Sequence, residues 1–189
     1  FSKRRDDAAQ WERYANNAKG ICIGFYKNKL DSLKRKIKEP FFLQTVFYDF
    51  NVRKHKHFDC VKNYICDNDL DPFTNEESLI ENIVATACSF KNVSFSAEDE
   101  IRAIILYVDS PSEFVRVEFE IRNGVIKKYA KIKWYDVCKK LELNIQDLIS
   151  EIIIGPRSQQ KIDILKEYLS LNDYDDLALK VKNSECPLR

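Results

Sequence analysis

The stretch Val115-Arg-Val-Glu-Phe-Glu-Ile-Arg-Asn-Gly-Val-Ile-Lys-Lys-Tyr-Ala-Lys-Ile132 decides the class of fold. The dipeptide Asn123-Gly124 at its centre favours a type I′ turn, which joins two antiparallel strands. Folding the stretch about this turn sets Ile121 opposite Ile126, with apolar side chains on one face and mainly charged side chains on the other. The stretch therefore predicts a hairpin whose apolar face covers a core.

On both sides of the hairpin, the chain alternates between helical and extended patterns. Apolar residues recur at helical spacing in some segments and at every second position in others. The expected helices are 8–15, 29–38, 52–66, 76–90, 134–148 and 162–169, and the expected strands are 21–25, 42–48, 98–106, 149–154 and 177–181. Asp6 and Asp7 can cap the first helix, and Ser158 can cap the last. We expect an α+β fold with a mostly antiparallel sheet, in one domain spanning residues 1–189.

Composition narrows the class of protein. A chain of 189 residues with 44% hydrophobic content can bury one core, and no window approaches the roughly 20 apolar residues of a membrane span. Because the chain has 31 basic and 30 acidic residues, its net charge gives no argument for a nucleic-acid or membrane partner. Six scattered cysteines without a Cys-x-x-Cys pair indicate free thiols in a reducing compartment. The sequence therefore predicts a soluble, cytoplasmic protein, and it predicts no metal site because a zinc site needs four ligands with paired spacing.

The stretch Phe95–Leu106 carries the most informative charges of the chain. Glu98, Glu100 and Arg102 stand at alternate positions, so in a strand all three side chains share one face. Carboxylates about 7 Å apart along a strand repel each other, and a guanidinium two positions on relieves that repulsion. The same face continues into Ile104, which places the trio where a buried strand emerges and where a fold can tune a carboxylate pKa. Two interpretations stay open: a surface ion ladder, or the acidic edge of a site.

Two further groups of residues are candidates for binding a ligand. Trp11 and Tyr14 lie three apart on one expected helix and can stack on a base or ring, although packing in the core is the more usual role of such a pair. Arg157 and Ser158 follow Gly-Pro at an expected strand-to-helix turn, which offers backbone N–H groups and a guanidinium to a phosphate. The same turn also serves as a plain helix start. These groups make a nucleotide the candidate ligand.

Four short blocks of the chain carry a family resemblance. They are Trp11-Glu-Arg-Tyr-Ala15 with Lys19-Gly-Ile-Cys-Ile-Gly-Phe25, Phe90-Lys91 with Glu98-Asp-Glu-Ile-Arg102, Glu151-Ile-Ile-Ile-Gly-Pro156, and Ser184 to Arg189. In this order they resemble the bacterial domain-of-unknown-function family 2971. Members of that family usually carry a Tyr-rich strand and an Asn-Asp-Pro motif before the first block, so the resemblance implies that an N-terminal segment is missing. The absence of methionine fits a missing N-terminal portion, or methionines left out of the sequence.

An enzyme hypothesis follows from a second resemblance. A strand-borne Glu-x-Glu late in a small α+β fold resembles the acidic motif of ADP-ribosyltransferases, which break the glycosidic bond of NAD. The resemblance implies that Glu100 stabilises the oxocarbenium-like transition state, that Glu98 orients an acceptor, and that Arg102 keeps the pair ionised or meets a phosphate. NAD would then be a substrate, and no resident cofactor is implied. No His-Tyr or Arg-Ser partner motif of the transferase type can be assigned.

The alternative hypothesis is a non-catalytic module that binds a protein partner. In that case the acidic trio and the charged face of the hairpin form salt bridges to the partner. The family resemblance implies a place in a bacterial defence or mobile-element system for either role. The two hypotheses differ in what should surround Glu100: an enzyme needs a concavity with an aromatic ring and an anion-holding group.

Overall fold

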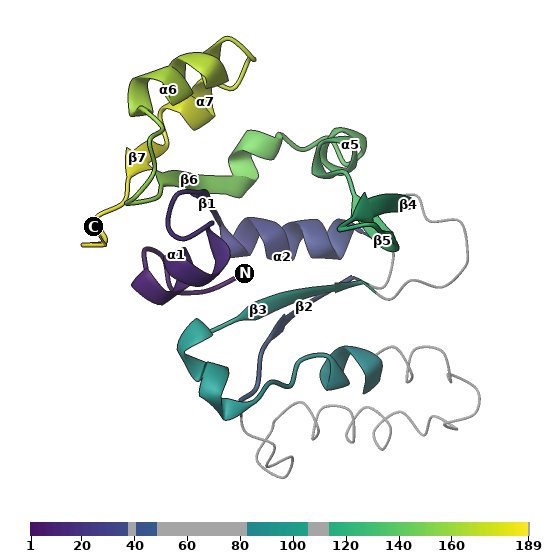
Figure 1. The fold of residues 1–189 in the computed structure, drawn as a ribbon. Coiled ribbons are helices and arrows are strands. Elements are labelled where there is room, and N and C mark those ends of the chain that lie inside the picture. The colour runs from purple at the N-terminus through teal and green to yellow at the C-terminus, as the bar shows by residue number, and fades with distance from the viewer. Residues whose placement is uncertain (38–40, 49–82, 106–113, 189) are drawn as a thin grey trace, which may run out of the picture. The chain divides into compact units, whose positions relative to one another are not determined.

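The chain divides into two compact units, each described here by itself. The computed structural model describes residues 1–37, 41–48, 83–105 and 114–188. Unit 1 comprises Phe1–Lys3 and Ile37–Val108, and unit 2 comprises Arg4–Lys36 and Asp109–Arg189. Helices and small, mostly antiparallel sheets occur in the described residues, which confirms the α+β class (Figure 1). The single domain expected over residues 1–189 stays a prediction.

Unit 2 contains a three-stranded sheet with the order β1-β6-β7. Its strands are β1 (Ile21–Phe25), β6 (Ile149–Ile154) and β7 (Val181–Asn183). The central strand β6 pairs antiparallel with β1 and parallel with β7. Its second half is a continuous apolar run that is buried on both faces, as a central strand should be. The strand predicted over 149–154 is therefore confirmed.

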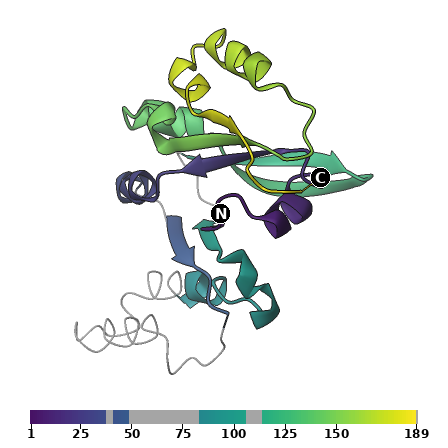
Figure 2. The ribbon, with the colours of Figure 1, turned by 90° about the vertical axis from the view of Figure 1, so that its left-hand side faces the viewer.

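Helices cover both faces of this sheet (Figures 1 and 2). On one face, α6 (Ile162–Ser170) and α7 (Asp175–Ala178) enclose a core cluster with the sheet. The buried members of this cluster are Ile149, Ile152, Ile154, Leu177 and Val181. On the other face, α1 (Ala8–Tyr14) packs Trp11 against Ile153, which points to the opposite side from Ile152 because side chains alternate along a strand.

The β4–β5 hairpin forms a separate two-stranded ribbon (Figure 2). β4 (Val115–Arg122) and β5 (Val125–Ile132) pair in the predicted register, with Ile121 opposite Ile126. Asn123 and Gly124 have φ of 53° and 75°, as a type I′ turn requires. The hairpin is therefore confirmed.

The predicted burial of the hairpin's apolar face is wrong for its outer half. Val115 at the root is buried, but Ile121 and Ile126 near the turn are 72% and 70% exposed. Alternation specifies which side chains share a face, but it does not specify how far along the strand a core extends. None of the described residues covers the outer half of this face.

Two predicted elements of unit 2 differ from the structure. The helix expected over 134–148 is interrupted: α5 (Trp134–Lys140) and η3 (Ile145–Leu148) flank Glu142, whose φ is 54°. The strand expected over 177–181 is wrong, because α7 is followed by β7. Two aspartates open α7 and favour its N-terminus, and short apolar runs do not distinguish a helix from a strand.

The caps of two helices also differ in part from the expectation. Asp7 caps α1, since its carboxylate accepts bonds from the backbone N–H groups of Ala9 and Gln10, whereas Asp6 makes other contacts. The N-cap of α6 is Lys161, with no side-chain hydrogen bond, so Ser158 is not the cap. The remaining helix of unit 2 is α2 (Lys27–Lys36), which covers most of the helix expected over 29–38.

Unit 1 has a small antiparallel pair at its centre. β2 (Phe41–Thr45) pairs with β3 (Ile101–Ile105), and the short helix η2 (Val93–Glu98) leads into β3. Ser2 forms an isolated bridge to Glu100, so the start of the chain extends this pair. Residues 83–87 are helical, as expected for this part of 76–90. The helix expected over 52–66 lies outside the described residues.

No helix among the described residues combines the length and apolar character that crossing a bilayer requires. The described cysteines Cys22, Cys88, Cys138 and Cys186 are free thiols. Both histidines of the sequence lie outside the described residues.

Candidate functional site

The acidic trio does not lie on one strand. Glu98 ends η2, Asp99 turns the chain with φ of 42°, and only Arg102 lies within β3. The prediction that three side chains alternate along a strand is therefore wrong for Glu98. The local reason is Asn92, whose side chain accepts a hydrogen bond from the N–H of Ser94 and starts the short helix.

Glu100 and Arg102 do share one side, as predicted. Arg102 Nε lies 2.8 Å from Glu100 Oε1, and the same side of the strand leads to buried Ile104. The same alternation predicts that Ala103 packs on the other side of the strand, but Ala103 is exposed, so this part of the prediction is wrong.

A lysine joins the two carboxylates. Lys91 Nζ lies 2.6 Å from Glu98 Oε2 and 3.2 Å from Glu100 Oε2. The Glu98 side chain is only 6% exposed, and that of Glu100 is 20% exposed. Lys91, Glu98, Glu100 and Arg102, which we call the ion network, thus combine two carboxylates with two cations. Its net charge is zero.

Neighbouring segments of unit 1 hold the ion network in place. The Ser2 hydroxyl donates to the backbone carbonyl of Glu98, and the Glu100 N–H donates to the Tyr48 hydroxyl oxygen. The Arg102 guanidinium donates to the carbonyl oxygen of Cys88. These bonds connect the start of the chain, β3 and the segment after residues 83–87. The ion network therefore ties together segments that lie far apart in sequence.

The electrostatics of the ion network keep its members charged. Burial alone would raise the pKa of Glu100, but hydrogen bonds and charges from Arg102 and Lys91 outweigh it and lower that pKa. The hydrogen bond with Glu98 raises the pKa of Lys91, and the bond with Glu100 raises that of Arg102. Glu100 is therefore a carboxylate at neutral pH and not a proton donor.

The lowered pKa of Glu100 predicts a specific loss of stability in acid. Because the folded value lies below the ordinary value of 4.5, the unfolded chain takes up the proton first as pH falls. The stabilising contribution is fully present well above pH 4.5 and is lost as pH falls through the folded pKa. We expect melting curves between about pH 3 and 7 to show a shallower acid limb for Glu100→Gln than for the wild type. Parallel limbs would contradict this contribution.

Trp11 does not present its ring to a ligand. It is 3% exposed in the cluster with Ala18 and Ile153, and its indole N–H donates to the Asp6 carboxylate at 2.5 Å. Tyr14 is 64% exposed on the same helix. The stacking pair proposed from the sequence is therefore not formed, and core packing explains Trp11.

The turn after β6 is occupied by bonds within the chain. The N–H groups of Gly155 and Arg157 donate to the carbonyls of Gly20 and Ala18, and that of Ser158 donates to the carbonyl of Gly155. Arg157 also donates from its guanidinium to the Asn17 side chain at 3.0 Å. The groups expected to cradle a phosphate already have acceptors within the chain. This favours a structural role for the turn over a phosphate site.

Two residues that the sequence did not indicate as site residues organise these sites. Lys91 holds the two carboxylates of unit 1, and it appeared only as part of a family block. In unit 2 the Asp6 carboxylate accepts bonds from Trp11, from the Ser184 hydroxyl at 2.6 Å and from the Glu185 N–H at 2.7 Å. Burial would raise the pKa of Asp6, but these hydrogen bonds lower it. No sequence signal reveals these partners. Lys91 meets carboxylates seven and nine positions on only because of the way η2 turns the chain, and Asp6 meets residues 178 and 179 positions away.

The comparison with protein families agrees with the resemblance for the first two motif blocks. The sequence model of the family described as "Protein of unknown function (DUF2971)" matches residues 10–103. The matched region therefore belongs to DUF2971, and the family assignment is confirmed. No curated protein and no solved structure shows significant similarity to the chain. The family description assigns no activity, so function has to be argued from the two units.

Proposed function

We propose that this chain is a non-catalytic module that binds a protein partner through the outer half of the β4–β5 hairpin. The observation behind this proposal is an open apolar surface made by Phe119, Ile121 and Ile126, which we call the tip surface. These side chains are 69%, 72% and 70% exposed, and the strand register places them on one face. Contiguous exposed apolar side chains within a polar surround are typical of an interaction site.

Charge indicates the chemistry of the partner. Between residues 115 and 133 the chain has six basic side chains and two acidic ones, whereas the whole chain has a net charge of +1. Both acidic side chains have nearby basic partners: Glu118 lies 2.7 Å from Lys131 and Glu120 lies 3.2 Å from Arg122. The hairpin thus keeps a positive excess around the tip surface. A partner surface that complements the hairpin would have an apolar centre with acidic side chains around it.

The proposal moves the docking surface away from the acidic trio. Glu98 and Glu100 are already bonded to Lys91 and Arg102, so forming salt bridges to a partner would require breaking internal ones. The tip surface requires no such exchange. Burying its three apolar side chains would supply the gain in free energy.

The enzyme hypothesis stays a prediction, and the ion network counts against it. A carboxylate stabilises a developing positive charge in proportion to its uncompensated field, but Lys91 and Arg102 offset the charges of Glu98 and Glu100. In its favour, Glu100 is ionised and keeps 20% of its side chain exposed. The test is whether the purified protein consumes NAD. If it does, and if Glu100→Gln abolishes this activity without changing the melting temperature at neutral pH, the enzyme is favoured over the binding module.

The binding proposal predicts loss of affinity in a hairpin variant. Partners are first cross-linked to the chain in an extract of cells that express it, then identified and purified. With the purified partner, Ile121→Ser/Ile126→Ser should raise the Kd at least tenfold by calorimetry, because two apolar anchors are worth about 1.4 kcal/mol or more. Binding should also weaken as salt screens the basic hairpin.

A matched control separates this surface from exposed apolar side chains in general. Leu171→Ser/Leu179→Ser removes two leucines that are 78% and 85% exposed after α6 and α7, and it should leave the Kd unchanged. Equal binding by the hairpin variant and the wild type would contradict the proposal. If the wild type forms a dimer and the hairpin variant is a monomer, the tip surface mediates self-association instead.

A further inference from the structure

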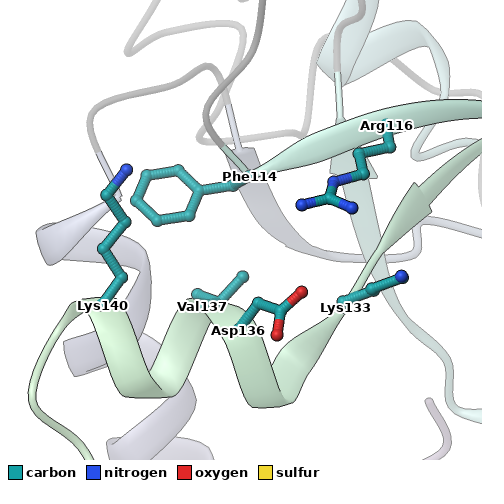
Figure 3. Close-up of a pocket in the computed structure, with 6 residues that line it drawn as sticks. All are labelled: Phe114, Arg116, Lys133, Asp136, Val137 and Lys140. Atoms are coloured by element: carbon teal, nitrogen blue, oxygen red, sulfur yellow. The ribbon is translucent and has the colours of Figure 1, made fainter.

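We propose that a pocket at the root of the hairpin binds a small organic anion, a carboxylate or a phosphate attached to an apolar group. The pocket lies in unit 2, between the start of β4, the end of β5 and α5 (Figure 3). Its volume is about 200 Å³, below the roughly 300 Å³ at which sites for drug-sized ligands begin, so only a ligand as small as a single substituted ring fits it. The lining residues are Phe114, Arg116, Lys133, Asp136, Val137 and Lys140.

Strand alternation and helix periodicity bring these side chains together. Phe114 directly precedes β4, and Arg116, two positions on, lies within that strand, so extended backbone directs both side chains to one face. Asp136 and Lys140 are four apart on α5, so they too share a face. Figure 3 shows Arg116 and Asp136 pointing toward the space between strand and helix.

The lining carries an excess of positive charge. Three of the lining residues are cationic, Arg116, Lys133 and Lys140, and one, Asp136, carries a carboxylate. This local excess contrasts with the near balance of the whole chain. A pocket with one predominant sign of charge attracts ions of the opposite sign.

The pocket also has apolar walls. Val137 is 1% exposed and lines the pocket, and the Phe114 ring lies beside it with Lys140 Nζ 5.4 Å from the ring centroid. Pockets for small molecules combine apolar walls with a few polar groups that fix orientation. Here the ring and the valine would contact an apolar group of the ligand.

Arg116 is the residue that would recognise the anion. A planar guanidinium donates two parallel hydrogen bonds to a carboxylate or a phosphate, which a lysine cannot do. Asp136 would accept from a hydroxyl or amine of the same ligand. The recognised chemistry is thus a flat or tetrahedral oxyanion on a small apolar group.

The test uses the full chain, labelled with ¹⁵N, and three probes at constant ionic strength. Phenyl phosphate and benzoate present the two anions on the same ring, and inorganic phosphate lacks the ring. We expect saturable shifts of the amides of Phe114, Arg116 and Val137 with phenyl phosphate or benzoate, and the tighter probe identifies the anion. Inorganic phosphate should bind at least fivefold more weakly.

The variants decide whether Arg116 recognises the anion. Arg116→Gln should weaken binding of the tighter probe at least tenfold. The control Arg122→Gln lies on the same strand outside the pocket, with its guanidinium 5.4 Å from the Tyr129 ring centroid, and it should leave binding unchanged. Equal weakening in both variants, shifts centred elsewhere, or no saturation would overturn the proposal. None of the pocket residues belongs to the tip surface, so this outcome is independent of protein binding.

Discussion

Gly155→Ala lowers the free energy of unfolding by about 3 kcal/mol, because the new methyl group overlaps backbone atoms. A Cβ at this position would lie 2.4 Å from the carbonyl oxygen of Ala18 and 2.8 Å from that of Gly20. The Gly155 N–H donates to Gly20, and the Arg157 N–H donates to Ala18, so these bonds would have to break for the loop to move away. We expect the midpoint of thermal unfolding to fall by roughly 10 °C.

Another glycine provides the control for this substitution. Gly124 has φ of +75°, and a Cβ added there would meet nothing within 4 Å, so alanine faces only an unfavourable backbone conformation. Gly124→Ala should cost about 1 kcal/mol. If Gly155→Ala melts no lower than Gly124→Ala, the close approach of the two backbones does not constrain this position.

Lys91→Met should destabilise the protein by about 3 kcal/mol at neutral pH. The substitution removes the ammonium group 2.6 Å from Glu98 and leaves a carboxylate with a side chain only 6% exposed. A buried charge that loses an ion pair is among the most destabilising changes that a single substitution makes. Denaturant unfolding of the purified variant measures the loss.

A second substitution tests whether the buried charge is the cause. Glu98→Gln removes that charge, so Lys91→Met/Glu98→Gln should recover more than half of the loss, which appears as coupling in a double-mutant cycle. Lys131→Met breaks the exposed pair with Glu118 and should not change the unfolding midpoint measurably. Additive effects of Lys91→Met and Glu98→Gln would show that the ion network does not couple these two residues.

The elements that the sequence predicted correctly depend on contacts within a few residues. Asn123-Gly124 sets the turn, and from the turn follows the whole register of β4 and β5. The apolar run of β6 predicts a central strand, and Asp7 caps the helix that it precedes. Where a short apolar run lacked such local signals, as at residues 177–181, the predicted strand was wrong.

The candidate site shows a different limit. Alternation placed Glu100 and Arg102 on one side correctly, but it could not show that Lys91 lies between Glu98 and Glu100. That position depends on the turn of η2, which brings Glu98 to 2.6 Å from a lysine seven residues earlier in the chain. The chemistry expected of the carboxylates changes with this neighbour, because a compensated charge has little field left for a substrate.

The sequence by itself determined the α+β class, the antiparallel hairpin and the family. Turn preference, side-chain alternation and capping act between neighbours, so they can be read from a single stretch. Only the tertiary structure decided that Asp6 reaches Ser184, 178 positions away, that Lys91 and Arg102 together offset the charges of Glu98 and Glu100, and that the hairpin's outer face stays open. The physical reason is that burial and ion pairing depend on which distant segments pack together, and local patterns do not specify that packing.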